Sequence, residues 1–155
     1  MNRSGSIPTP LCGSCKAHGH CRLGAGDIVL DGPRAIVEAA CVESFHAGPR
    51  VAHGGWTAAL FDDVLGRSLL LRGLRAVTGT LTIDFLKPVP IEERLVVEIT
   101  LDSHEGRKVA LSASLRLLAG GEALARARGI WIERRPDHFL RHEAEMRKRG
   151  FGGGR

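Results

Sequence analysis

The chain has 155 residues, 43% hydrophobic and 25% charged, which is the balance of an ordinary globular protein with one domain. No apolar run of about 18 residues is present, and the polar N-terminus lacks the apolar core of a secretory signal, so we expect a cytoplasmic protein with free thiols and no membrane partner. The net charge of +5 does not indicate nucleic-acid binding: residues 134–155 carry +4 of it, and a chain with no Tyr and five Phe offers few rings for base stacking.

The predicted elements alternate in a simple order along the chain. Residues 1–25 are rich in Pro, Gly, Ser, Cys and His without periodicity, and we expect an irregular arm. Residues 55–71 are almost all apolar or small and predict one long buried helix. Residues 136–155 form a basic tail that begins with a short polar helix. Strands are predicted at 27–31 and 34–42, joined by a Gly32-Pro33 turn, and then at 77–85, 95–101, 109–117 and 123–134.

These elements predict an α+β protein in which an antiparallel sheet of five to six strands covers one buried helix. The folded domain is expected to span residues 26–135. A single sheet of this kind leaves its edges and one helix flank exposed, so we expect a homodimer or a dimer of dimers with the functional sites at the subunit interface.

Two adjacent aspartates in the predicted helix face different surroundings. Asp63 precedes Arg67 by four residues, the order that favours an ion pair, and we interpret it as part of a surface pair. Asp62 has only apolar or small residues at helical spacing and no partner charge. Because burying an unpaired carboxylate costs several kcal/mol, Asp62 is a candidate catalytic group. The alternative is that it accepts hydrogen bonds from loop amides or lies at an edge.

The residues just before this helix, His53-Gly54-Gly55, suggest an oxyanion site. Two glycines let the backbone approach a ligand closely, and N–H groups at a helix N-terminus stabilise a developing negative charge. Simple turn chemistry explains a glycine pair equally well.

The segment HAGPRVAHGGWTAALFDDVLG, residues 46–66, resembles the signature loop and helix of hotdog-fold thioesterases related to the phenylacetate-degradation thioesterase. In that family the catalytic acid follows the His of HGG by nine residues, and here that position is Asp62. The resemblance implies the hotdog fold and the hydrolysis of acyl-CoA to a free acid and CoA. It implies that the thioester carbonyl is held at Gly54 N–H while Asp62 activates water or attacks directly, with His53 shaping the loop.

A second segment, TGTLTIDFLKPVPI at residues 78–91, is similar to a strand of the same family. Relatives place a Ser or Thr ten residues before the Pro, near the active site from the partner subunit, and here this residue is Thr78. The resemblance implies that Thr78 positions the attacking water. The alternative is that Thr78, Thr80 and Thr82 form an ordinary polar strand face.

Further substrate contacts follow from the resemblance. Arg107 and Lys108, in GRKVA, are candidates for the CoA phosphates, although hairpin charges are common. Gly55 adjoins the oxyanion site, and His46 stands near the position where many relatives have an Asn. Trp56 is a candidate for the acyl tunnel or, alternatively, for the core.

The arm contains Cys12, Cys15, His18 and Cys21, which together could bind Zn²⁺, although their spacing matches no standard zinc finger. Our primary expectation is therefore that the protein holds no metal and no cofactor apart from the CoA of its substrate. A different function on the same fold is an acyl-CoA binding or sensing module without catalysis. A hydratase is less consistent with the sequence, because its relatives have a His in the helix and residues 56–71 contain none.

Overall fold

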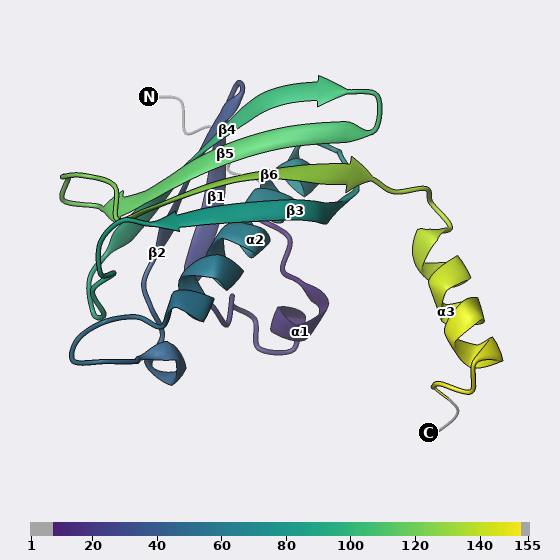
Figure 1. The fold of residues 1–155 in the computed structure, drawn as a ribbon, viewed down its shortest axis with the longest axis horizontal. Helices are drawn as coiled ribbons and strands as arrows, with labels where there is room; N and C mark the ends of the chain where they lie inside the picture. The colour runs from purple at the N-terminus through teal and green to yellow at the C-terminus, as the bar shows by residue number, and fades with distance from the viewer. Residues whose placement is uncertain (1–7, 153–155) are drawn as a thin grey trace.

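The computed structural model describes residues 8–152, and in them six strands form one antiparallel sheet in the order β1-β2-β4-β5-β6-β3. The long helix α2 lies against one face of this sheet (Figure 1), the arrangement of a hotdog fold, as the sequence predicts. The strands are β1 Ala25–Asp31, β2 Arg34–Ala39, β3 Ala76–Phe85, β4 Leu95–Glu105, β5 Lys108–Leu117 and β6 Ala125–Glu133. The helices are α1 Gly13–Lys16, α2 Gly54–Leu71 and α3 His138–Lys148, with a 3-10 turn η1 at Glu43–Phe45.

Alternation of side chains along the strands decides which face of the sheet meets α2. On β2, Ala35 and Val37 are each 1% exposed, while Ile36 between them is 48% exposed. The strand β5 repeats this alternation, while β4 begins with three consecutive buried residues, Leu95 to Val97, and alternates only after them. The sheet therefore turns a mainly apolar face toward α2 and a more polar face toward solvent. Each large side chain buried between the two layers contributes about 1.5–3 kcal/mol relative to exposure. On α2 these side chains are Trp56, Leu60, Phe61, Val64 and Leu65.

One irregularity in β3 determines which way Thr78 points. Thr78 lies opposite Trp131 of β6, but Thr80 lies opposite the adjacent Ile130, so Gly79 is an extra residue in a β-bulge. Side chains that lie opposite each other in a sheet share a face, and Trp131 is buried. Thr78 therefore belongs to the α2 face and Thr80 to the outer face. The interpretation of Thr78 as one of three threonines on a single polar face is wrong, because it assumed unbroken alternation.

The N-terminal arm is more ordered than its composition suggests. It contains the short helix α1, and Cys15 and Cys21 are only 5% and 6% exposed. The indole Nε1–H of Trp56 on α2 donates a hydrogen bond to the carbonyl of Leu23 at 2.9 Å. The end of the arm is thus attached to the same helix that carries the candidate site. At the other end of the chain, α3 is the predicted polar helix, and it extends away from the body (Figure 1).

Candidate active site

The N-terminus of α2 is shaped by His53, which caps the helix. His53 is in an extended conformation, with φ −63° and ψ 135°, and its Nδ1 accepts a hydrogen bond from Gly55 N–H at 2.8 Å. A Cβ atom on Gly55 would approach that ring nitrogen to 2.9 Å, so the cap requires glycine there. The geometry supports the expectation that His53 shapes the loop, and it engages the N–H of Gly55 rather than leaving it for a ligand.

Gly54 N–H is the donor that the cap leaves available. No residue in the described range 8–152 accepts a hydrogen bond from it, and Gly54 is exposed. Next to it is a hollow of about 300 Å³ whose lining includes Gly54, Thr57, Phe85 and Leu86. Phe85 and Leu86 are 59% and 47% exposed, which is unusual for large apolar side chains beside a polar donor. The sequence pattern did not single out these two residues, although they stand at the end of a strand just before Lys87-Pro88.

Asp62 and Thr78 meet on the flank of α2. The hydroxyl of Thr78 donates a hydrogen bond of 2.6 Å to Oδ1 of Asp62. This contact depends on the bulge at Gly79, which turns Thr78 toward the helix. Both residues belong to the same chain, whereas the family resemblance placed the hydroxyl on the partner subunit. The remaining acceptor sites of the carboxylate are open for water or a ligand.

The surroundings of the two aspartates are the reverse of what the sequence suggested. Asp62 is exposed in the single chain, because its side of α2 borders the open edge strand β3 rather than the centre of the sheet. Asp63 is the buried one of the two. Its carboxylate pairs with Arg67 at 2.7 Å, and the side chains are only 17% and 6% exposed, so the ion pair is correct but its surface location is wrong. The thiol of Cys21 lies 3.9 Å from the same carboxylate oxygen.

The helix itself separates the two halves of the candidate site. Gly54 and Asp62 are eight residues apart on α2. At 1.5 Å per residue this places them about 12 Å apart along the helix axis. One thioester carbonyl cannot contact both groups of a single chain.

The other predicted residues lie at varied distances from this region. His46 ends η1 in the loop before α2, where it forms an isolated bridge with Ala52. Trp56 is fully buried in the core, a position that favours the core alternative over contact with substrate. Arg107 and Lys108 are exposed at the turn between β4 and β5, and the Arg107 guanidinium donates two hydrogen bonds to the carbonyl of Glu133.

The cysteine-rich arm does not assemble a set of metal ligands in this structure. Among residues 8–152 no three His, Cys, Asp or Glu side chains are placed to hold a metal ion. Cys15 and Cys21 are buried while Cys12 is exposed, and all three are free thiols. Cys41, two residues beyond the end of β2, is buried in the core.

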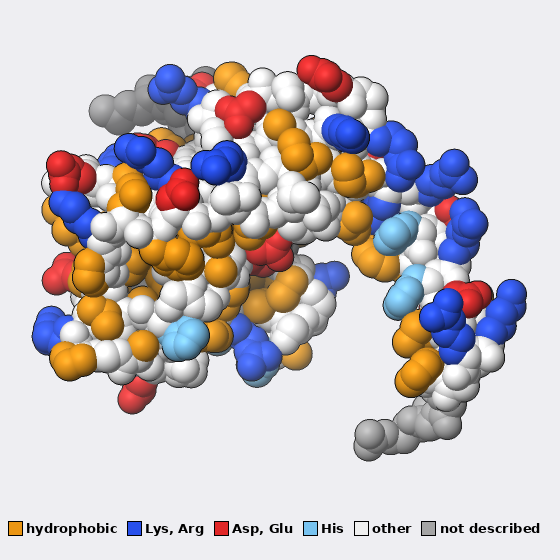
Figure 2. Space-filling model, in the orientation of Figure 1, with side chains coloured by type: hydrophobic (Ala, Val, Ile, Leu, Met, Phe, Trp, Pro, Cys, Tyr) orange, Lys and Arg blue, Asp and Glu red, His pale blue; other side chains and the backbone are white. Residues whose placement is uncertain are grey.

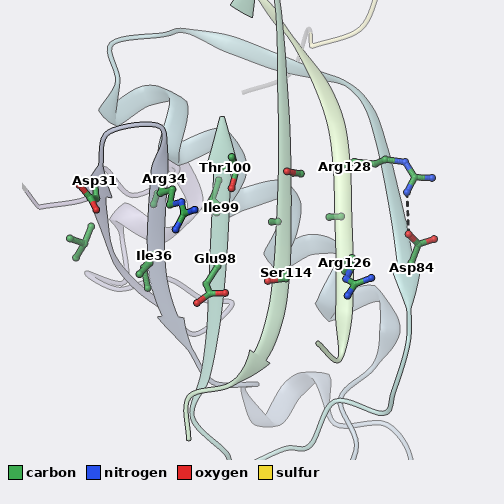
Figure 3. Close-up of a pocket in the computed structure, with 15 residues that line it drawn as sticks. Asp31, Arg34, Ile36, Asp84, Glu98, Ile99, Thr100, Ser114, Arg126 and Arg128 are labelled. Carbon is green, nitrogen blue, oxygen red and sulfur yellow. Dashed lines mark hydrogen bonds and ion pairs between the residues drawn. The ribbon is translucent and has the colours of Figure 1, made fainter. Parts of the chain in front are cut away.

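A hollow of about 730 Å³ lies on the polar face of the sheet, away from α2 (Figure 3). Strand register sets Arg34, Thr100, Ser112 and Arg128 in one row across it. Ser112 and Ser114 on β5 are smaller than the residues beside them on the neighbouring strands, and this difference in size creates the depression. None of the predicted catalytic or substrate-binding residues lines it.

Comparison with known proteins places this site in a family. The family model described as the thioesterase superfamily matches residues 50–123, which include the cap, α2 and Thr78. Over this segment, just under half of its length, the chain is similar to the thioesterase superfamily. Among curated relatives, acyl-coenzyme A thioesterase THEM4 of Bos taurus is 34% identical over 89 residues, covering 57% of this chain but only 36% of the relative.

Solved structures of the superfamily share the fold. The PaaI protein of the phenylacetic acid degradation operon of E. coli superposes with a TM-score of 0.66 at 22% identity, covering 80% of this chain and 86% of that one. A thioesterase protein of Streptococcus pneumoniae, solved with coenzyme A, gives 0.63 at 19% identity and covers 69% and 86%. None of the helices in the described part of the chain is long and apolar enough to cross a bilayer.

Proposed function

We propose that this protein hydrolyses acyl-CoA thioesters to a free acid and CoA. The observation that carries the proposal is the hydrogen bond from Thr78 to Asp62, which fixes an exposed carboxylate beside an open strand edge. Such a carboxylate, held by one donor and otherwise accessible, is suited to accept a proton from water. The similarity to THEM4 covers only part of that relative, and it supports the same substrate class.

In the proposed reaction, the thioester carbonyl accepts a hydrogen bond from Gly54 N–H at the positive end of the α2 dipole. Asp62 takes a proton from a water molecule held by Thr78 while the water oxygen bonds to the carbonyl carbon. The C–S bond then breaks, and the proton passes from Asp62 to the leaving thiolate. Direct attack by Asp62, with an anhydride that water later hydrolyses, is the alternative route.

The active site is proposed to form between two copies of the chain. Gly54 and Asp62 of one chain are too far apart to act on one carbonyl, so Gly54 of one copy faces Asp62 and Thr78 of the other. The unpaired edge of β3 supports this arrangement, since an exposed strand edge next to the site offers backbone groups for pairing. The hollow beside Gly54, with Phe85 and Leu86, would then receive the acyl group.

Removing each half of the site separately tests this proposal. In Gly54→Pro the oxyanion N–H is lost, but proline suits the first residue of a helix, and the extended His53 before it is compatible. We expect Gly54→Pro and Asp62→Asn each to lower kcat/KM for acyl-CoA by about 10²–10³. Gly54→Ala keeps the N–H, adds a methyl group 3.5 Å from Phe85, and should retain most activity.

Mixing the two inactive variants tests the shared site. A mixed dimer contains one active centre in which both Gly54 and Asp62 are native, so unfolding and refolding the variants together should recover about a quarter of the native activity. Mixtures with no more activity than the separate variants would contradict the shared site. CoA binding without turnover by the native protein on short-chain, long-chain and aromatic thioesters would instead favour a sensing module.

A further inference from the structure

A cationic hollow lies outside the catalytic region, where β6 leads into α3. Its volume is about 210 Å³, and three arginines and one aspartate give its lining a formal charge of +2 with His138 neutral. Figure 2 shows Lys and Arg side chains gathered at this end of the molecule. The full lining is Arg107, Arg135, Asp137, His138 and Arg141.

The arginines of this hollow are poorly neutralised. Arg107 is held in place because its Nε and Nη2 donate to the carbonyl of Glu133 at 3.0 and 2.8 Å, which leaves its positive charge without a carboxylate. Within residues 8–152, neither Arg107 nor Arg135 has a carboxylate at ion-pair distance, and Arg141 reaches Asp137 only at 4.0 Å.

Other arginines on the same helix behave differently. Arg147 pairs with Glu143 at 2.5 Å and Arg149 with Glu145 at 3.0 Å, each one turn away on α3. In the described part of the tail, both arginines near the end of α3 thus have a close carboxylate, whereas those that line the hollow at its start do not.

We infer that this hollow binds a phosphate monoester, namely the nucleotide end of the CoA thioester, and so strengthens binding of CoA esters over thioesters that lack phosphates. Guanidinium groups bind phosphate through paired N–H donors, which suits a fixed arginine joined by two others that lack a close carboxylate. This inference rests on the proposed function for the identity of the ligand. Arg135, His138 and Arg141 lie beyond residues 50–123, so this chain adds them to the part matched by the family model.

The position of the hollow is compatible with one ligand that reaches both regions. Trp131 on β6 lies opposite Thr78, and Glu133, which holds Arg107, is two residues further along the strand. Two residues of extended strand span about 7 Å. The thiol and the phosphates of CoA stand at opposite ends of a long flexible arm, which can bridge such a separation.

The test compares Arg135→Ala/Arg141→Ala with the control Arg147→Ala/Arg149→Ala in the full chain. Calorimetry should show that the first variant binds CoA at least tenfold more weakly, a change of about 1.4 kcal/mol, while the control matches the native protein. Dephospho-CoA should bind the native protein more weakly than CoA does. The KM for an acyl-CoA should rise in the first variant, whereas the KM for the same acyl group on N-acetylcysteamine should stay unchanged.

The outcomes separate this inference from the proposed function. If the native protein turns over no thioester but binds CoA, and the double alanine variant loses that binding, the hollow is supported while the hydrolysis is not. Equal CoA affinity in the native and Arg135→Ala/Arg141→Ala proteins would overturn the inference. A second result would also overturn it: ATP or inorganic phosphate binds as tightly as CoA, and the KM for acyl-CoA is the same in the native and double alanine proteins. The hollow would then serve a phosphate from another source.

Discussion

Thr78 and Asp62 show how a single extra residue in a strand can place a hydroxyl at a catalytic carboxylate. The bulge favours glycine at position 79, since a Cβ there would lie 3.1 Å from the carbonyl oxygen of Ile130, a tighter contact than is usual. The bulge rotates Thr78 from the solvent face to the helix face of the sheet. Its hydroxyl then donates to Asp62 and leaves the second carboxylate oxygen for water.

At this scale we predict that Thr78→Ala lowers kcat for acyl-CoA hydrolysis by about tenfold to a hundredfold, because the water and the carboxylate lose a positioning hydrogen bond. Thr78→Ser keeps the hydroxyl and should recover most of the rate. Thr80→Ala, on the opposite face of the same strand, is the matched control and should leave kcat unchanged. Steady-state kinetics on one acyl-CoA measures all three, and equal losses from Thr78→Ala and Thr80→Ala would contradict the assigned role.

Helix α2 carries the two halves of the proposed site and is held from both sides. The sheet covers its apolar face, while the N-terminal arm meets its other side through Trp56 and Leu23 and through Cys21, Asp63 and Arg67. The Asp63–Arg67 pair is buried under the arm, where removal of one charge leaves the other without a partner.

We therefore predict that Asp63→Asn destabilises the protein by roughly 3 kcal/mol, because Arg67 would remain buried without a compensating charge. This makes Asp63 an unsuitable control for Asp62 in activity assays. Glu143→Gln removes one partner of the exposed Arg147 pair on α3 and should change stability by less than about 1 kcal/mol. Chemical denaturation monitored by tryptophan fluorescence compares the two, and equal midpoints would argue against a structural role for the buried pair.

At the scale of the whole molecule, the described sheet ends in two edge strands, β1 and β3, and the edge of β3 lies beside the exposed Asp62. We propose the division into an arm of residues 1–25, a domain of 26–135 and a tail of 136–155. The domain supplies the catalytic groups, and the tail supplies part of the cationic hollow. Because the halves of the proposed site are about 12 Å apart in one chain, activity should require association.

Light scattering coupled to size exclusion should accordingly give a mass that is an integer multiple of 16.7 kDa, at least twice that value. On dilution, kcat per chain should fall with the same midpoint as the measured mass, since a separated chain has only half of each site. A fully active species of 16.7 kDa would contradict the shared site.

The sequence by itself determined the strands, the two longer helices and the layers of this protein, but not the short helix α1 or the turn η1. Alternating apolar residues predicted all six strands, because a strand buried on one face has an apolar residue at every second position. The apolar run at 55–71 predicted α2, because a helix buried on most sides is apolar along its length. The spacing from His53 to Asp62 selected one of two adjacent aspartates as the candidate acid, and the structure leaves that carboxylate open.

Only the tertiary structure decided the surroundings of these residues. Burial of Asp63 rather than Asp62 depends on where the arm and the open edge of β3 lie, which local periodicity does not record. The direction of Thr78 depends on a register shift against β6, and a shift of one residue exchanges the faces of a strand. The cationic hollow joins Arg107 to Arg135 and Arg141 from a separate element, so only packing brings their charges together.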